Sequence, residues 1–142
     1  MSKSFRYESN AKEVEAQLLK AADAGMKAAL LLVEASAKAN AAVQSGEMRD
    51  KIDHKSKRSG DTLSGRVGSP LEHGIYNEFG TGEFAENGAG RKGGWSYKGP
   101  DGQWRFTYGM KPRPFLRPAF RSNRKNIEDI IGKEYSSSFK GV

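Results

Sequence analysis

The chain has 142 residues, no cysteine and a formal net charge of +7, with a mean hydropathy of −0.74. This length suits a single domain over residues 1–142, and the lack of cysteine excludes both a disulfide scaffold and a thiolate metal site. No run approaches the ~20 apolar residues that a membrane span needs. The start of the chain is charged, so we expect no signal peptide and expect synthesis in a reducing cytoplasm.

The positive charge is concentrated in one window. Residues 91–125 carry ten Lys and Arg residues against a single acid, Asp101. A local cationic surface favours an anionic neighbour, which could be nucleic acid or an acidic protein face.

Residues 10–42 read as one long helix, with alanine at 12 of positions 11–42. A stripe of mostly small apolar residues recurs in steps of three and four, which predicts the buried face: Val14, Leu18, Ala21, Gly25, Ala28, Leu32, Ala35, Ala39 and Ala42. A second apolar edge runs beside it: Leu19, Met26, Leu30, Leu31 and Val33. The helix would span roughly 48 Å, more than a small domain needs, which hints at an intersubunit role. Ser45 and Gly46 are expected to end it.

Two hairpins are expected after the helix. Residues 48–58 and 62–67 predict the first, around a turn at residues 59–61, and residues 95–98 and 104–108 predict the second. Between them, residues 70–79 predict a short helical turn. Residues 80–94, with six glycines, predict a mobile loop.

The second hairpin is rich in aromatic residues. Its alternation places Trp95 and Tyr97 on one face of one strand, and Trp104, Phe106 and Tyr108 on one face of the other. Such rings on a basic sheet could stack on the bases of a single strand. The alternation favours a second interpretation, in which they form the core face beneath the long helix.

Three prolines stiffen residues 111–120. Proline fixes its own φ and disfavours helix in the residue before it, so the segment should run extended to Arg117, with Pro118 opening the last helix. The apolar positions of that helix are Phe120, Ile127, Ile130, Ile131 and Tyr135. We expect residues 1–9 and 136–142 to be flexible. The fold class is α+β, with a long N-terminal helix and a C-terminal helix packed on a small antiparallel sheet.

The sequence offers little for catalysis or cofactor binding. His54 and His73 stand alone beside acids, without a metal-binding spacing. Residues 88–93 match GxGxxG, but they precede a hairpin rather than opening a helix, so the match lacks the context of a dinucleotide site. We therefore expect no enzymatic activity, no catalytic residues, no metal and no cofactor.

Three ordered segments are similar to the phage head–tail connector family, also called tail-completion or minor tail proteins, of lambdoid siphophages and prophages. The first, residues 42–52 (AVQSGEMRDKI), resembles the family's PV-x-TG-x-LRDSI junction, with Ala42 and Met48 in place of proline and leucine. The second, residues 75–82 (IYNEFGTG), resembles its Y-x-x-FVEFGT element. The third, residues 113–120 (RPFLRPAF), resembles its xPFLRPA element.

The resemblance implies a non-enzymatic structural protein of the virion neck, made in the host cytoplasm and assembled as a ring, expected to be a hexamer. Its partners would be further copies of itself and the adjoining head-connector and tail-tube proteins, with non-specific contact to packaged DNA and none to a membrane. Eight residues are the expected interaction positions: Tyr76, Glu78, Phe79, Arg91, Lys92, Arg113, Arg117 and Arg121. For Phe115 and Leu116, core packing is at least as good an expectation as an interface. The alternative function is a small basic nucleic-acid-binding module using the hairpin at residues 95–108, and a weaker third is a tail-tube or stopper subunit.

Overall fold

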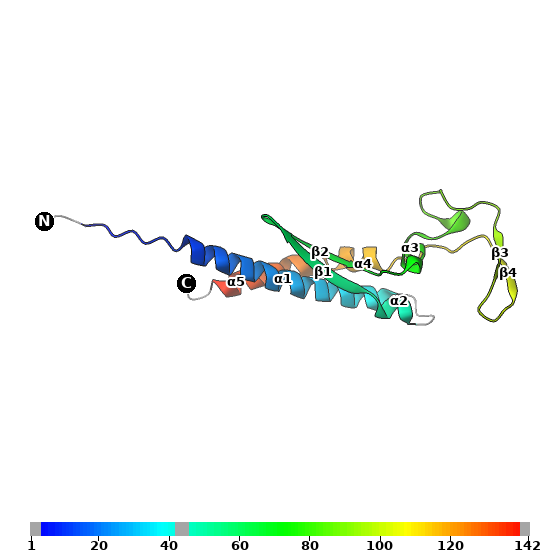
Figure 1. Cartoon of the computed structure of the whole chain (residues 1–142), viewed down its shortest axis with the longest axis horizontal. Helices are drawn as coiled ribbons and strands as arrows, with labels where there is room; N and C mark the ends of the chain where they lie inside the picture. The colour runs from blue at the N-terminus through cyan, green and yellow to red at the C-terminus, as the bar shows by residue number, and fades with distance from the viewer. Residues whose placement is uncertain (1–3, 42–45, 140–142) are drawn as a thin grey trace.

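The computed structural model describes residues 4–41 and 46–139, and its long axis follows one helix (Figure 1). Helix α1 (Ala11–Asn40) is preceded by an extended N-terminal segment that points away from the body of the molecule. Its most extensive contacts are with four other elements, namely the strands β1 (Asp53–Ser59) and β2 (Thr62–Gly68) and the helices α4 (Leu116–Ser122) and α5 (Arg124–Ser138). The remaining elements are α2 (Glu47–Asp50), α3 (Glu72–Phe79), the 3-10 turn η1 (Gly82–Phe84), β3 (Trp95–Lys98) and β4 (Trp104–Thr107).

The predicted fold class is confirmed. The protein is α+β, but its strands form two separate antiparallel hairpins, β1–β2 and β3–β4. The hairpin β1–β2 lies against α1, whereas α5 lies along α1 itself. Pairing in β1–β2 runs from Asp53 with Gly68 to Ser59 with Thr62.

The buried face of α1 follows four-residue steps through Ala21, Gly25, Ala29, Val33, Ala37 and Ala41. The predicted stripe is right at Ala21 and Gly25. It is wrong at four exposed positions, Val14, Leu18, Ala35 and Ala39, and Ala42 lies outside the described residues. Helix α1 is covered on two neighbouring sides, by α5 on one and by the β1–β2 hairpin on the other. Residues on both sides are buried, so a single stripe in steps of three and four does not describe the buried face. Of the second apolar edge, Leu30 and Val33 are buried while Leu19 and Leu31 are exposed.

The close approach of α1 to its neighbours depends on two glycines. A Cβ at Gly65 of β2 would lie 2.5 Å from Met26 Sδ and 2.7 Å from Leu30 Cδ2, so only glycine fits without movement. A Cβ at Gly25 would lie 3.3 Å from Cα of Ile131 on α5. The small residues of α1 therefore set how near its partners come.

The core lies at the C-terminal half of α1. Val33, Ala37 and Ala41 pack there against Met48, Ile52, Phe115 and Ala119. Phe115 has no exposed surface, so core packing is the correct interpretation of this residue, and Leu116 packs partly buried against the same cluster.

Three predicted element boundaries are wrong. Residue Met48 belongs to the short helix α2, and the strand begins only at Asp53, because Met48 is held in the core by a helical turn. Helix α4 begins at Leu116 rather than Pro118; Pro118 is tolerated as its third residue because early helical N–H groups need no partner within the helix. Asn123 separates α4 from α5, where a single helix was expected.

The two ends of the chain and the C-terminal end of α1 can also be compared with the predictions. Residues 4–10 are exposed and without regular structure, while residues 136–138 complete the last turn of α5. Helix α1 ends at Asn40, and Gly46, with φ 78°, directly precedes α2 as its N-cap residue. The expected stop at Ser45 lies outside the described residues, as do residues 1–3 and 140–142.

The hairpin β3–β4 stands at the far end of the molecule from the N-terminus (Figure 1). Its second strand exposes 72% of Trp104 and 57% of Phe106, and the next residue but one, Tyr108, is 51% exposed. The expectation that these rings form a core face beneath α1 is wrong. Alternation put the rings on one side of the strand, but only tertiary structure could tell which side is covered.

Residues 80–94 have a defined backbone path. Their N–H groups at Thr81 and Glu83 donate to the carbonyls of Met110 and Tyr108, which ties the loop to the segment after β4. A Cβ at Gly90 would lie 2.0 Å from the carbonyl oxygen of Gly82, so this middle glycine of the GxGxxG match serves loop packing, and the match precedes β3 as expected. The mobility of this loop remains a prediction.

Candidate assembly surface

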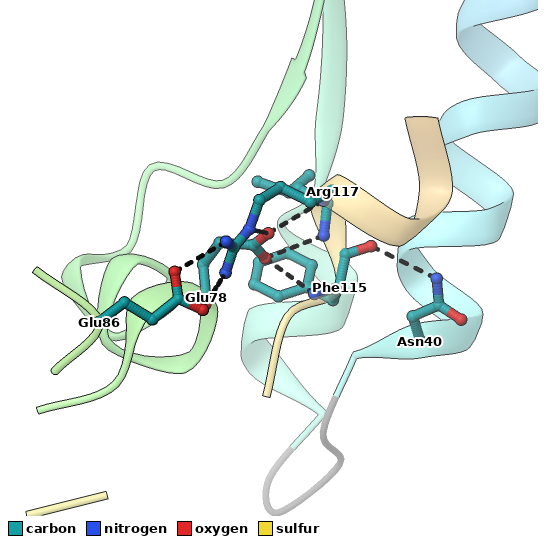
Figure 2. A network of polar contacts seen from close by, with 6 residues as sticks. Asn40, Glu78, Glu86, Phe115 and Arg117 are labelled. Carbon is teal, nitrogen blue, oxygen red and sulfur yellow. Dashed lines mark hydrogen bonds and ion pairs between the residues drawn. The ribbon is translucent and has the colours of Figure 1, made fainter. Parts of the chain in front are cut away.

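A buried carboxylate joins α3 to the start of α4. Glu78 is only 3% exposed, and its side chain accepts hydrogen bonds from the backbone N–H groups of Phe115 (2.8 Å), Leu116 (3.0 Å) and Arg117 (2.9 Å). These are N–H groups at the beginning of a helix, which lack partners within the helix. Glu78 therefore caps α4 from a distant part of the sequence, as Figure 2 shows.

Arg117 completes this network. Its Nε lies 2.9 Å from Glu78, its Nη1 and Nη2 lie 2.8 and 2.9 Å from the two carboxylate oxygens of Glu86, and its Nη2 also donates to the Glu78 carbonyl at 2.6 Å (Figure 2). The guanidinium lies over the Phe79 ring, 4.9 Å from its centroid. One arginine thus ties α3, α4 and the loop after α3 together.

The network sets the charge state of its members. Burial acts to raise the pKa of Glu78, but the N–H groups of Leu116, Arg117 and Phe115 and the Arg117 guanidinium outweigh it, so the pKa lies below its usual value of 4.5. The Arg117 guanidinium likewise lowers the pKa of Glu86. The hydrogen bonds that Arg117 donates to Glu86 and Glu78 raise its own pKa. All three groups are charged at neutral pH.

An open apolar groove of about 420 Å³ lies beside this network. Phe115 and Leu116 line its inner part, and α3 and α4 form its sides. Its exposed rim includes Ile75 (62% exposed), Phe79 (47%) and Phe120 (40%). Several large apolar side chains gathered around one groove are typical of a protein–protein contact site.

The expected interaction residues fall into separate places. Glu78, Phe79, Arg117 and Arg121 all line the groove. Glu78 and Arg117 are engaged within the chain, whereas Arg121 is exposed at the rim.

The other four expected residues lie outside the groove lining. Tyr76 is 48% exposed on α3, and Arg113 is exposed, with its backbone N–H bonded to the Asn77 carbonyl at 2.6 Å. Arg91 and Lys92 precede the far hairpin, with Arg91 5.6 Å from the centroid of the Trp95 ring.

The sequence did not reveal the apolar rim of the groove, and it did not reveal Glu86 as a partner of Arg117. Ile75 and Phe120 have the sequence pattern of ordinary apolar helix positions. The tertiary structure brings them together at one groove, where Glu78 of α3 caps α4. Nothing local marks Glu86 as a partner for a residue 31 positions away.

One group of potential metal ligands occurs in the described part of the chain. Ligand atoms of Glu34, Asp53 and His54 lie within 4.8 Å of one another. Glu34 already binds Lys38 Nζ at 2.7 Å and His54 Nδ1, and hydrogen bonds from Lys38 and then His54 lower the pKa of Glu34. Both oxygens of the Glu34 carboxylate therefore already have polar partners, and its contact with His54 links α1 to β1.

The comparisons with known proteins bear on the same region. The family described as "Bacteriophage HK97-gp10, putative tail-component" matches residues 6–80, from the N-terminal segment through α3. This chain belongs to that family. No curated protein and no solved structure matches it. None of the described helices is long and apolar enough to cross a membrane.

Family membership confirms the resemblance to phage tail proteins. The matched residues include the first of the three motif segments and most of the second, while the third, residues 113–120, lies beyond them. The protein is a phage tail component, and as such it is a virion protein that contacts other virion proteins.

Proposed function

We propose that this protein is a neck component that completes the phage tail and joins it to the head by forming a ring, with six copies in the particle. Its partners are copies of itself and the adjoining head-connector and tail-tube proteins, with non-specific contact to packaged DNA. It is made in the host cytoplasm and has no catalytic activity. Membership of the tail-component family supports the setting, and the exposed surface of the isolated chain supports assembly.

That surface is the observation that carries the proposal. The chain exposes 10750 Å², whereas a compact monomer of 15.6 kDa is expected to expose about 7200 Å². The excess of roughly 3500 Å² is as large as the area that permanent protein complexes bury. Several large apolar side chains are part of this surface, including the groove rim and the β3–β4 rings.

The expected interaction residues then act in two ways. Tyr76, Phe79, Arg113 and Arg121 offer exposed contact surface around α3 and α4. Glu78 and Arg117 hold those two helices in a fixed relation, so that the contact surface is preformed. Arg91 and Lys92 provide positive charge near the hairpin, facing an acidic neighbour or DNA.

Loss of the gene tests this function. Particles lacking the protein should contain DNA-filled heads and separate tails, and expression of the intact chain from a plasmid should restore joined particles in electron micrographs. A matched control is the chain with the conservative substitution Lys92→Arg, which should also restore joining. Normal infectious tailed particles in the absence of the protein would refute the proposal.

A second candidate function is nucleic-acid binding by the β3–β4 hairpin. The 72% exposure of Trp104 favours it, because this ring is free to stack on a base. Cationic residues Lys98, Arg91 and Lys92 lie nearby in sequence, although Arg105 is paired with Asp101 at 2.6 Å.

Filter binding of single-stranded DNA over a salt series tests this candidate. Tight binding that weakens steeply with salt, and that Trp104→Ala lowers, supports it. Trp95→Ala and Tyr97→Ala extend the test to the first strand, and Ile75→Ala at the distant groove is the control. Binding that none of the hairpin substitutions changes would refute it.

A further inference from the structure

The N-terminal segment, residues 4–10, is the part of the described chain that packs least. Phe5 is 95% exposed and Tyr7 is 89% exposed. The segment is extended and projects away from the helices (Figure 1). Its ion pair, between Arg6 and Glu8, is itself largely exposed. Two aromatic rings held in water on an extended segment are unusual unless something else covers them.

The N-terminal segment is too short to place its two aromatic rings in the groove of its own chain. The groove is lined by Phe115, which packs with Val33 in the core. From Asn10 to Val33 the α1 axis runs about 35 Å, at ~1.5 Å per residue. Phe5 lies five residues before Asn10, so it reaches at most about 18 Å from the helix start. A groove that Phe5 and Tyr7 fill must therefore belong to another copy.

The groove suits this occupant. In an extended segment, Phe5 and Tyr7 point to the same side and lie about 7 Å apart. The groove has an apolar lining, a volume of about 420 Å³ and an open rim at Ile75 and Phe120. Two aromatic side chains would bury roughly 300–500 Å² of surface there.

Charge favours the N-terminal segment over the other exposed aromatic element. The rim carries Arg121, and the β3–β4 hairpin lies in the strongly cationic window of the chain, so the two would repel. Residues 4–10 carry one arginine and one glutamate and have no net charge. Glu8 follows Tyr7 directly and can exchange its exposed partner Arg6 for Arg121.

We propose that the N-terminal segment of one copy inserts Phe5 and Tyr7 into the α3–α4 groove of the next copy. The contact is head-to-tail, because the donor and the acceptor are two different surfaces of the chain. Head-to-tail contacts generate a ring when the rotation between copies closes. This inference rests on the proposed ring and names the two surfaces that form it.

Paired variants of the full chain test the contact. Phe5→Ser with Tyr7→Ser removes the donor without touching the folded body, and Ile75→Asp with Phe120→Asp blocks the acceptor at exposed rim positions. In sedimentation over a concentration series, each variant should self-associate at least about 30-fold more weakly than the parent. Leu31→Ser is the control, because Leu31 is an exposed apolar residue of α1 that belongs to neither surface, and this variant should assemble as the parent does. Circular dichroism checks that the variants are folded.

Mixing the two variants gives the sharper result. Donor-defective and acceptor-defective chains retain one intact surface each, so the mixture should form one-to-one pairs that do not grow further. When the parent self-associates, absence of pairs in the mixture, or assembly of either variant like the parent, would overturn the inference.

Cross-linking in particles covers the case in which the purified parent stays monomeric. Because the chain has no cysteine, Phe5→Cys with Ile75→Cys introduces the only two thiols. Oxidised tails carrying this variant should yield a ladder of linked copies, whereas Phe5→Cys alone should yield none. Joined particles without a ladder overturn the inference and leave the neck function standing. Joined particles formed without the protein at all refute the neck function instead.

Discussion

Replacing Glu78 with glutamine should destabilise the protein strongly at neutral pH. The carboxylate accepts three backbone N–H groups at the start of α4 and the Nε of Arg117. Glutamine has the same shape, but its amide NH₂ faces donors and cannot accept from them. Hydrogen bonds to a charged group contribute about 1.5–3 kcal/mol each and do not add fully. We expect Glu78→Gln to lower the free energy of unfolding by about 3–5 kcal/mol.

Urea unfolding followed by circular dichroism measures this loss. With a total stability of roughly 5–15 kcal/mol for a domain, a 3–5 kcal/mol loss is a large share, and the melting temperature should fall by about 10 °C. Glu72→Gln is the matched control, because Glu72 is an exposed glutamate on the same helix, and it should stay within about 0.5 kcal/mol of the parent. A Glu78→Gln variant as stable as the Glu72→Gln control would refute the capping role of this carboxylate.

The remaining predictions concern pH, packing and exposure. The pKa of Glu78 is lowered in the folded state, so its contribution to the free energy of unfolding is complete above pH 4.5 and is lost as the pH falls further. Urea unfolding at a series of acidic pH values should show this loss of stability in the parent and less of it in Glu78→Gln. Phe115→Ala empties a fully buried site and should cost about 3–5 kcal/mol in urea unfolding; a cost below 1 kcal/mol would contradict the assigned core. Gly65→Val meets Met26 and Leu30 and should cost about 1–3 kcal/mol; an unchanged urea midpoint would show that β2 is not pressed against α1. Trp104→Ser, at a largely exposed ring, should leave the melting temperature unchanged; a marked fall would mean that the hairpin packs on the body.

Part of the assembly surface could be read from the sequence and part could not. Glu78, Phe79, Arg117 and Arg121 were predicted from two distant parts of the sequence, and folding brings all four to one groove. The capping of α4 by Glu78 was hidden, because a carboxylate that caps a helix usually lies just before it in the chain. Here the cap comes from 37 residues upstream of Phe115, a relation that no local pattern encodes.

Local chemistry was enough for the elements themselves. The alanine-rich composition of residues 11–42 favours helix at nearly every position, and glycine-containing turns between β-prone runs favour the two hairpins. Helix and hairpin formation depend on neighbours a few residues apart, so the sequence by itself determined the α+β class and the order of the long helix, the two hairpins and the C-terminal helical segment.

Which faces are covered was decided only by the tertiary structure. The rings of Trp104 and Phe106 have the alternation of a buried face and yet lie in water, whereas Ala37 is fully buried outside the predicted stripe. Alternating residue types indicate that the two faces of a strand differ. Whether a face is buried depends on whether another part of the chain packs against it. Because α1 is contacted by α5 and β1–β2 on neighbouring sides, and β3–β4 stands beyond that body, the covered and open surfaces follow from long-range packing alone.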